Sequence, residues 1–162
     1  MLRGELTATQ QLTLISSYDD LSQALEGAFF VQECVFEQLE IKQSVFQEVE
    51  QIVGKDVILS SSTSCLVPSS VFSTVQNKSR CLVSHPVNPP YYVKLVELVP
   101  HPQTTATIMD TTHALMTKEC SKSLSLNHFG ISKNRIVIVK IPPVKFFGPL
   151  MHLTQHSHPA GD

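Results

Sequence analysis

The sequence predicts an α/β protein in which parallel strands are joined by crossover helices. Short apolar runs of strand character alternate along the chain with segments of helical periodicity, which is the element order of this fold class. The clearest helical pattern covers residues 37–53, and a strand-like run stands on each side of it. The strands also open directly into polar loops, where open α/β sheets place ligands.

The first elements follow from caps and periodicity. The pair Asp19 and Asp20 can cap a short helix that stops at Gly27, and residues 28–31 follow as an apolar strand. Gln, Glu and Lys separate the apolar positions of the long helix, and Gly54 is its stop signal. Those apolar positions are Leu39, Val45, Phe46, Val49, Ile52 and Val53.

The later elements continue the alternation. We expect strands at residues 57–59, 81–85 and 93–99, a short helix at 68–75 between the first two, and a helix at 104–118 after the third. The strand at 93–99 is expected to be the last of the parallel series.

Polar side chains stand at the ends of these strands. Five hydroxyl residues, 60–64, follow one strand, and His85 ends the next. Histidine is the natural acid or base among them, because imidazole exchanges a proton near neutral pH. Ser64 and Asn88 are expected to hydrogen-bond oxygens of a substrate or cofactor.

Glu97 is the expected partner of the imidazole. Strand alternation places Glu97 between Leu95 and Val99 on one face, and a carboxylate there needs a partner. The proline-rich turn lets the chain double back toward His85. Spacing alone leaves a second interpretation open, namely a core histidine, an exposed strand glutamate and a Ser/Thr turn before a helix.

Composition limits the class of protein. The 162 residues are 42% hydrophobic and 16% charged, which suits one globular domain, and the net charge is −2. We therefore expect a small-molecule partner, with neither nucleic acid nor membrane. No secretory signal or apolar span is present, so a cytoplasmic protein is expected.

The cysteines and the terminal histidines suggest weaker alternatives. The four cysteines lack C-x-x-C spacing, so they are expected to be free thiols in or near the core. Cys65, beside Ser64, is an alternative nucleophile of a second enzyme class. His152, His156 and His158 could bind a metal, but an exposed polar terminus is the preferred interpretation, and no metal site is expected.

Five segments of the chain together resemble the 3-hydroxyacyl-CoA dehydrogenase family. They are Gln32–Glu37, Ser60–Leu66, Ser84–Tyr92, Lys94–Val99 and Asp110–Met116. The resemblance implies a partial Rossmann-type NAD-binding domain that oxidises a secondary hydroxyl group with NAD. The implied substrate is a hydroxy acid such as L-gulonate, or a 3-hydroxyacyl-CoA thioester.

The resemblance also assigns roles to residues. His85 is implied to be the catalytic base and Glu97 the group that orients it, while Ser64 and Asn88 contact both substrate and nicotinamide. Two further cofactor contacts fall on Glu37 and Lys42. The chain departs from the family at Phe36, where a proline is usual.

Parts of the family pattern are missing. The six glycines show no G-x-G spacing, so the turn that approaches a pyrophosphate is absent. We expect residues 1–118 to be a partial NAD-binding domain and residues 119–162 a divergent, poorly ordered and irregular C-terminal tail. The family's helical domain, through which its members usually form homodimers, is also missing. We therefore expect a truncated isoform that is inactive alone, and a non-catalytic, crystallin-like structural role is the alternative.

Overall fold

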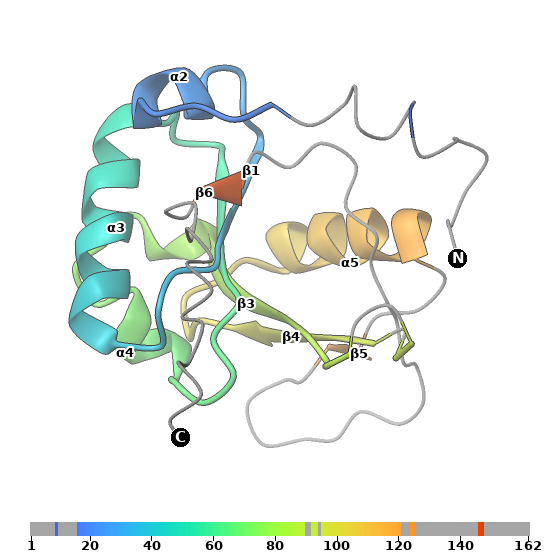
Figure 1. Ribbon diagram of the computed structural model, residues 1–162. Coiled ribbons are helices and arrows are strands. Elements are labelled where there is room, and N and C mark those ends of the chain that lie inside the picture. The colour runs from blue at the N-terminus through green and yellow to red at the C-terminus, as the bar shows by residue number, and fades with distance from the viewer. Residues whose placement is uncertain are drawn as a thin grey trace, which may run out of the picture.

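The computed structural model describes residues 9, 16–89, 92–93, 95–120, 124–125 and 146–147. Helices lie on both faces of a sheet, with α2, α3 and α4 on one face and α5 on the other (Figure 1). In chain order the elements are α2 (Leu21–Leu25), β1 (Phe30–Glu33), α3 (Leu39–Ile52), β2 (Ile58–Ser61), α4 (Pro68–Val71), the 3-10 helix η1 (Lys78–Arg80), β3 (Cys81–Pro86), β4 (Val96–Pro100), α5 (Ala106–Cys120), β5 (Leu124–Ser125) and β6 (Phe146–Phe147).

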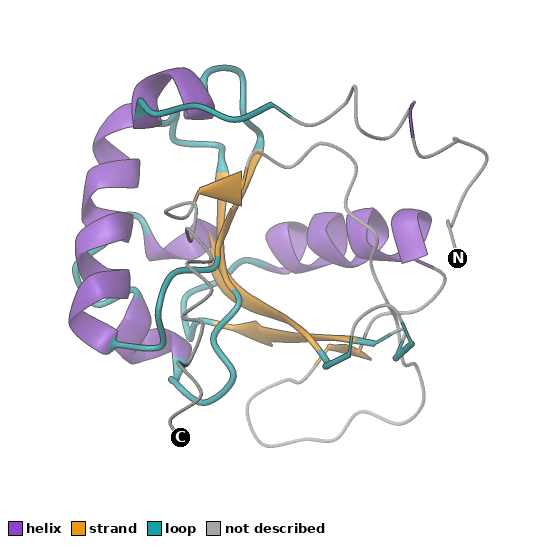
Figure 2. Ribbon diagram, in the orientation of Figure 1, coloured by secondary structure: helices purple, strands orange, loops and turns teal. Residues whose placement is uncertain are grey.

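The strand order is β5-β4-β3-β2-β1-β6, and β1, β2 and β3 run parallel to one another. The predicted α/β class with parallel strands and crossover helices is confirmed, and Figure 2 shows the two layers of helices around the strands. The fourth strand differs from the expectation, because β4 runs antiparallel to β3. The physical reason is the short connection of residues 87–95, since a parallel crossover needs about a dozen residues or more.

The core on one face lies between the sheet and α2, α3 and α4. Phe46 and Val49 of α3 are fully buried there, and the ring of Phe46 packs 4.6 Å from that of Phe72. The N-cap of α2 is Asp20, whose Oδ1 accepts a hydrogen bond of 2.8 Å from the amide of Gln23. Of the six apolar positions predicted for α3, Phe46 and Val49 are buried, and Leu39, Val45 and Val53 are partly buried against the same core. Ile52 differs from the prediction, because it lies in the last turn of α3 and is 36% exposed.

Arg80, the last residue of η1, binds the turn that follows α3. Its guanidinium donates to the carbonyl oxygens of Gly54 at 2.5 Å and Val57 at 3.2 Å, and it pairs with Glu50 at 3.4 Å. Both carbonyl groups lie after the C-cap of α3, Val53, so the buried guanidinium fixes the turn between α3 and β2.

The core on the other face lies between the sheet and α5. It contains Phe30, Ile58, Leu82, Val96, Leu98 and Met116. None of the helices that the structure describes is long and apolar enough to cross a membrane. Most of the tail expected at residues 119–162, including the three terminal histidines, lies outside the described residues.

Candidate active site at the strand ends

The three parallel strands end at one edge of the sheet, and each ends in polar residues. β1 ends with Glu33, β2 with Ser61, and β3 carries His85 next to its last residue. Because parallel strands of one sheet present their carboxyl ends together, side chains from distant parts of the sequence converge at this edge.

His85 lies between Glu97 and Ser64. Its Nδ1 is 2.8 Å from Glu97 Oε2, and its Nε2 is 3.0 Å from the Ser64 hydroxyl. A carboxylate only accepts hydrogen bonds, so Nδ1 carries the proton, and in the neutral ring Nε2 accepts from Ser64. The imidazole is therefore held with its lone pair directed at a hydroxyl group.

The antiparallel pairing of β3 and β4 brings His85 and Glu97 together. His85 and Glu97 stand directly opposite each other in the register of the two strands. Val96 and Leu98 point to the α5 face and are buried, whereas the Glu97 side chain is 35% exposed. Alternation in the sequence thus predicted the face on which Glu97 lies, and the register of β3 and β4 sets it opposite His85.

Glu37 binds the loop that carries Ser64. One oxygen of its carboxylate, Oε1, accepts from the Thr63 hydroxyl, from the Ser64 amide at 3.0 Å and from the Cys65 amide at 3.4 Å. Partial burial opposes ionisation, but the hydrogen bonds from Thr63, Lys42 and Ser64 outweigh it and lower the pKa of Glu37 to about 2.

Lys42 is fully enclosed beneath this loop. Its ammonium group lies 2.9 Å from Glu33 and 3.2 Å from Glu37, and it donates to the Val35 carbonyl oxygen at 3.3 Å. The side chains of Lys42 and Glu33 are each 1% exposed. Ser61 donates a further hydrogen bond of 2.6 Å to Glu33, so the buried charges are all paired.

A second hydrogen-bonded network links the same three strands on the face of the sheet that packs against α5. The Gln32 amide nitrogen donates to the carbonyl oxygen of Ser84 at 3.1 Å and to the Ser62 hydroxyl, and its oxygen accepts from the Ser84 hydroxyl at 2.7 Å. Ser60 lies 2.6 Å from that hydroxyl. The sequence analysis did not identify this network; polar residues at the ends of adjacent apolar strands were the available signal.

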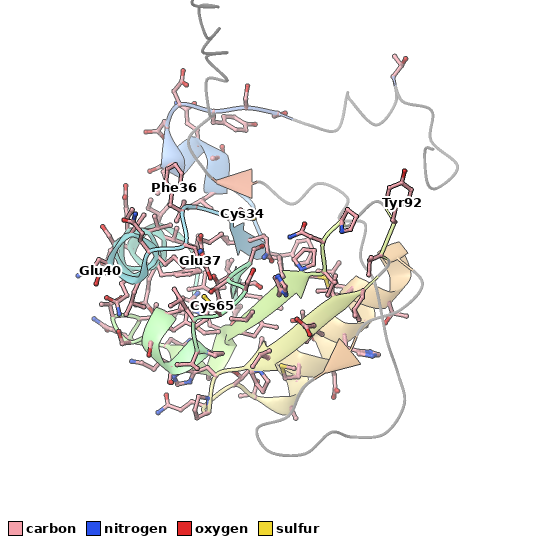
Figure 3. All side chains as sticks on the ribbon, turned by 60° about the horizontal axis from the view of Figure 1, so that its bottom comes forward. Cys34, Phe36, Glu37, Glu40, Cys65 and Tyr92 are labelled. Atoms are coloured by element: carbon pink, nitrogen blue, oxygen red, sulfur yellow. The ribbon has the colours of Figure 1, made fainter. Side chains whose placement is uncertain are left out.

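Asn88 occupies a different setting from the other expected site residues. It is exposed, in the loop between β3 and β4, and a hydrogen bond of 2.9 Å from Val87 to Leu95 closes that loop. Figure 3 shows Glu37 and Cys65 at the strand ends and Tyr92 on this loop. The structure therefore gathers Ser64, His85 and Glu97 into one hydrogen-bonded series, and Asn88 lies in the loop that follows β3.

The cysteines do not form the expected core set. Cys34 and Cys65 are exposed, and only Cys81, of the three whose side chains the structure describes, is buried. The Glu37 carboxylate, which accepts from the Cys65 thiol at 3.5 Å, raises the pKa of that thiol. This environment disfavours the thiolate that a nucleophilic Cys65 requires. Within the described residues, no three His, Cys, Asp or Glu side chains are grouped to hold a metal.

Comparison with known proteins gives the family. Residues 2–125 match the family described as 3-hydroxyacyl-CoA dehydrogenase, NAD binding domain. The lambda-crystallin homolog of Homo sapiens is 48% identical over 137 residues, which are 83% of this chain and 43% of that protein. The homolog of Rattus norvegicus is 56% identical over 117 residues, covering 72% of this chain and 37% of the relative. The chain thus spans less than half the length of these relatives.

Solved structures show the same fold. The 3-hydroxybutyryl-CoA dehydrogenase of Escherichia coli superposes with a TM-score of 0.69 at 25% identity, covering 76% of this chain and 27% of that one. The 3-hydroxyacyl-CoA dehydrogenase of Archaeoglobus fulgidus gives a TM-score of 0.58 at 26% identity, over 64% and 36% of the two chains. Both the family expected from the motifs and its cofactor, NAD, are confirmed. The chain belongs to the 3-hydroxyacyl-CoA dehydrogenase family, which it matches through the NAD-binding domain.

Proposed function

We propose that this chain carries the proton-transfer site of an NAD-dependent oxidoreductase that oxidises a secondary hydroxyl group. The substrate class is a hydroxy acid of the L-gulonate type or a 3-hydroxyacyl-CoA thioester. The observation that carries the proposal is the series Ser64, His85 and Glu97, with its two contacts of 3.0 Å and 2.8 Å.

His85 acts as the general base. Its Nε2 takes the proton of the substrate hydroxyl, and Glu97, on Nδ1, holds the ring in the required tautomer and stabilises the imidazolium that forms. Ser64 donates to Nε2 before substrate arrives and then to the substrate oxygen, which it holds near the base. The chemistry that bound NAD would supply is a hydride acceptor for the carbon that bears this hydroxyl group, so that the alcohol would become a ketone.

The cofactor side of the site consists of Ser64, Asn88 and Glu37, and Lys42 is enclosed behind Glu37, whose carboxylate it contacts. The exposed amide of Asn88 and hydroxyl of Ser64 suit the polar groups of nicotinamide. The Glu37 side chain is 38% exposed and its ionised carboxylate suits a ribose hydroxyl. These donors and acceptors fit the nicotinamide end of the cofactor.

The pyrophosphate end of NAD lacks its usual receptor in this sequence, because no glycine pair has G-x-G spacing. Each charge-assisted hydrogen bond of such a turn is worth about 1.5 to 3 kcal/mol, and the loss of two lowers affinity roughly 100-fold or more. We therefore propose that the 162-residue chain alone binds NAD weakly and does not turn over substrate.

The test is a chimaera in which residues 16–120 replace the matching segment of the rat lambda-crystallin homolog. NADH formation is measured with L-gulonate and with 3-hydroxybutyryl-CoA. His85→Ala should lower kcat by about 10² to 10⁴, as expected for loss of a general base. His113→Ala, on α5, is the matched control. A chimaera whose activity survives His85→Ala within a few-fold rules out the proposed base.

A structural role without catalysis is the second candidate. The names of the curated relatives favour it, since several are lambda-crystallins or their homologs. The chimaera separates the two candidates, because the 162-residue chain alone is expected to bind NAD weakly under either one. A chimaera that folds, binds NAD and yet forms no NADH with either substrate favours the structural role.

A further inference from the structure

We propose that Glu37 is a positioning residue that holds the Ser64 hydroxyl against His85, and that the buried Lys42 acts on the site only through Glu37. The inference rests on the proposed function, because it assigns a purpose to the contact between Ser64 and the base.

The geometry of the loop is the first step. Glu37 Oε1 gathers the Thr63 hydroxyl and the amides of Ser64 and Cys65, which are consecutive groups of one turn. Ser64 lies outside any helix or strand, so the sheet hydrogen bonds do not fix it. Figure 3 shows Glu37 on the inner side of α3, near Cys65, with Glu40 on the outer side of that helix.

The position of the hydroxyl is the second step. The Ser64 backbone amide donates to Glu37 while the Ser64 side chain contacts His85 Nε2 at 3.0 Å. A turn that loses its carboxylate partner would let this hydroxyl leave the imidazole. Within the described residues, two neutral hydrogen bonds of 3.2 Å and 3.0 Å, between Thr63 and Ser61 and between Leu66 and Thr63, would still support the turn.

The donor count of Lys42 is the third step. An ammonium group has three N–H donors, and here Glu33, Glu37 and the Val35 carbonyl oxygen engage them. With 1% of its side chain exposed, Lys42 reaches a ligand only by giving up one of these partners. Its influence on the site therefore passes through Glu37 Oε2, which it holds at 3.2 Å.

The charges explain why Glu37 can hold several groups at once. Glu33 and Glu37 bring two negative charges to one ammonium, so the cluster keeps one uncompensated negative charge at the exposed carboxylate. The N–H and O–H groups of the turn donate hydrogen bonds to this carboxylate, and bonds to a charged acceptor are stronger than bonds to a neutral one. An uncharged side chain at position 37 would bind the turn more weakly.

The test reads the imidazole of His85 directly, without turnover, on the full chain labelled with ¹⁵N. Ser64→Ala defines the Nε2 chemical shift without a serine donor. Glu37→Ala should reproduce that shift while Nδ1 keeps its wild-type value, and Ser64 amide exchange should rise by about 10-fold to 100-fold. Glu37→Gln should restore much of the wild-type signal, since its amide oxygen still accepts from the turn. Glu40→Ala, an exposed glutamate in the first turn of α3, is the matched control.

The outcomes separate this inference from the proposed function. If Ser64→Ala shifts Nε2 and a folded Glu37→Ala does not, the positioning role is wrong and the catalytic series stands. If Ser64→Ala leaves Nε2 unchanged, the contact between Ser64 and His85 is absent, and both the inference and the proposed series are overturned. Near-wild-type thermal unfolding of Glu37→Ala shows that its effect is local. If that variant does not fold, Glu37→Gln is read instead: an Nε2 shift displaced part of the way toward that of Ser64→Ala, together with faster Ser64 amide exchange, supports the positioning role. Wild-type values of both in Glu37→Gln overturn it.

Discussion

Lys42 of α3 and Glu33 of β1 form an ion pair of 2.9 Å in which each side chain is 1% exposed. Removing one partner of such a pair leaves an uncompensated buried charge, which costs far more than the pair itself contributes. A substitution in the cluster of Glu33, Glu37 and Lys42 should therefore affect the stability of the fold as well as the candidate site.

We expect Lys42→Met to lower the free energy of unfolding by about 3 to 5 kcal/mol, because Glu33 is then charged, buried and unpaired. Urea unfolding followed by circular dichroism measures the change. Lys55→Met, at an exposed lysine, is the control and should have little effect. The double variant with Glu33→Gln should recover part of the loss, and a loss in Lys42→Met no larger than in the control would contradict the prediction.

The stability of the protein should depend on the ionisation of Glu37. The pKa of this carboxyl is lowered from 4.5 to about 2, so the stabilisation is present above the unfolded value and disappears as the pH falls through the folded one. Between about pH 5 and pH 2 the urea midpoint of the wild type should therefore fall more steeply than that of Glu37→Gln. Superimposable pH profiles of the two proteins would show that Glu37 is not stabilised in the folded state.

Thiol labelling should distinguish Cys81 from Cys34 and Cys65. Burial raises the pKa of the Cys81 thiol to about 12, and its side chain is 0% exposed. We expect Cys81 to react with a maleimide only after unfolding. Cys34 and Cys65 are exposed and should react in the native protein, though more slowly than a free thiol, because the pKa of each is raised. Peptide mass spectrometry after a short pulse of reagent reads each site, and native labelling of Cys81 at the rate of Cys34 would be the contrary result.

Glu97 should determine the tautomer of His85. In the wild type the carboxylate accepts from Nδ1–H at 2.8 Å, so Nε2 is free of a proton in the neutral ring. In Glu97→Gln the amide can also present its N–H₂ group to Nδ1, so we expect the tautomer with the proton on Nε2 to become populated. Long-range ¹H–¹⁵N spectra of the ring measure this, and Glu48→Gln on α3 serves as the control. An unchanged tautomer would separate Glu97 from the imidazole.

Much of this arrangement could be predicted because it depends on local patterns. Apolar periodicity gave the buried side of α3, and alternation gave the face of Glu97. The direction of β4 was missed because strand propensity carries no information on pairing partners. The burial of Lys42 was also missed, since a lysine among Gln and Glu reads as a solvated position until its distant partner Glu33 is known.

The networks around Gln32 and Glu37 could not be predicted for a related reason. Their contacts join residues of different strands, or of the loops that follow them, which are 24 to 52 residues apart, and spacing in sequence does not encode such contacts. The family resemblance named Glu37 and Lys42 together, but it did not distinguish an exposed carboxylate from an enclosed ammonium. The structure shows that Lys42 lies behind Glu37, and the inference that Lys42 acts through Glu37 depends on that arrangement.

The antiparallel register of β3 and β4 restricts how the loop between them can change. Side chains in a strand alternate between faces, so a slip of one residue would exchange Glu97 for Val96 or Leu98 opposite His85. Insertions and deletions can therefore accumulate at the exposed tip of the loop, around Pro89, as long as the closing hydrogen bond from Val87 to Leu95 is kept. During divergence of such chains, the length of this loop can vary while the pairing that flanks it stays in phase.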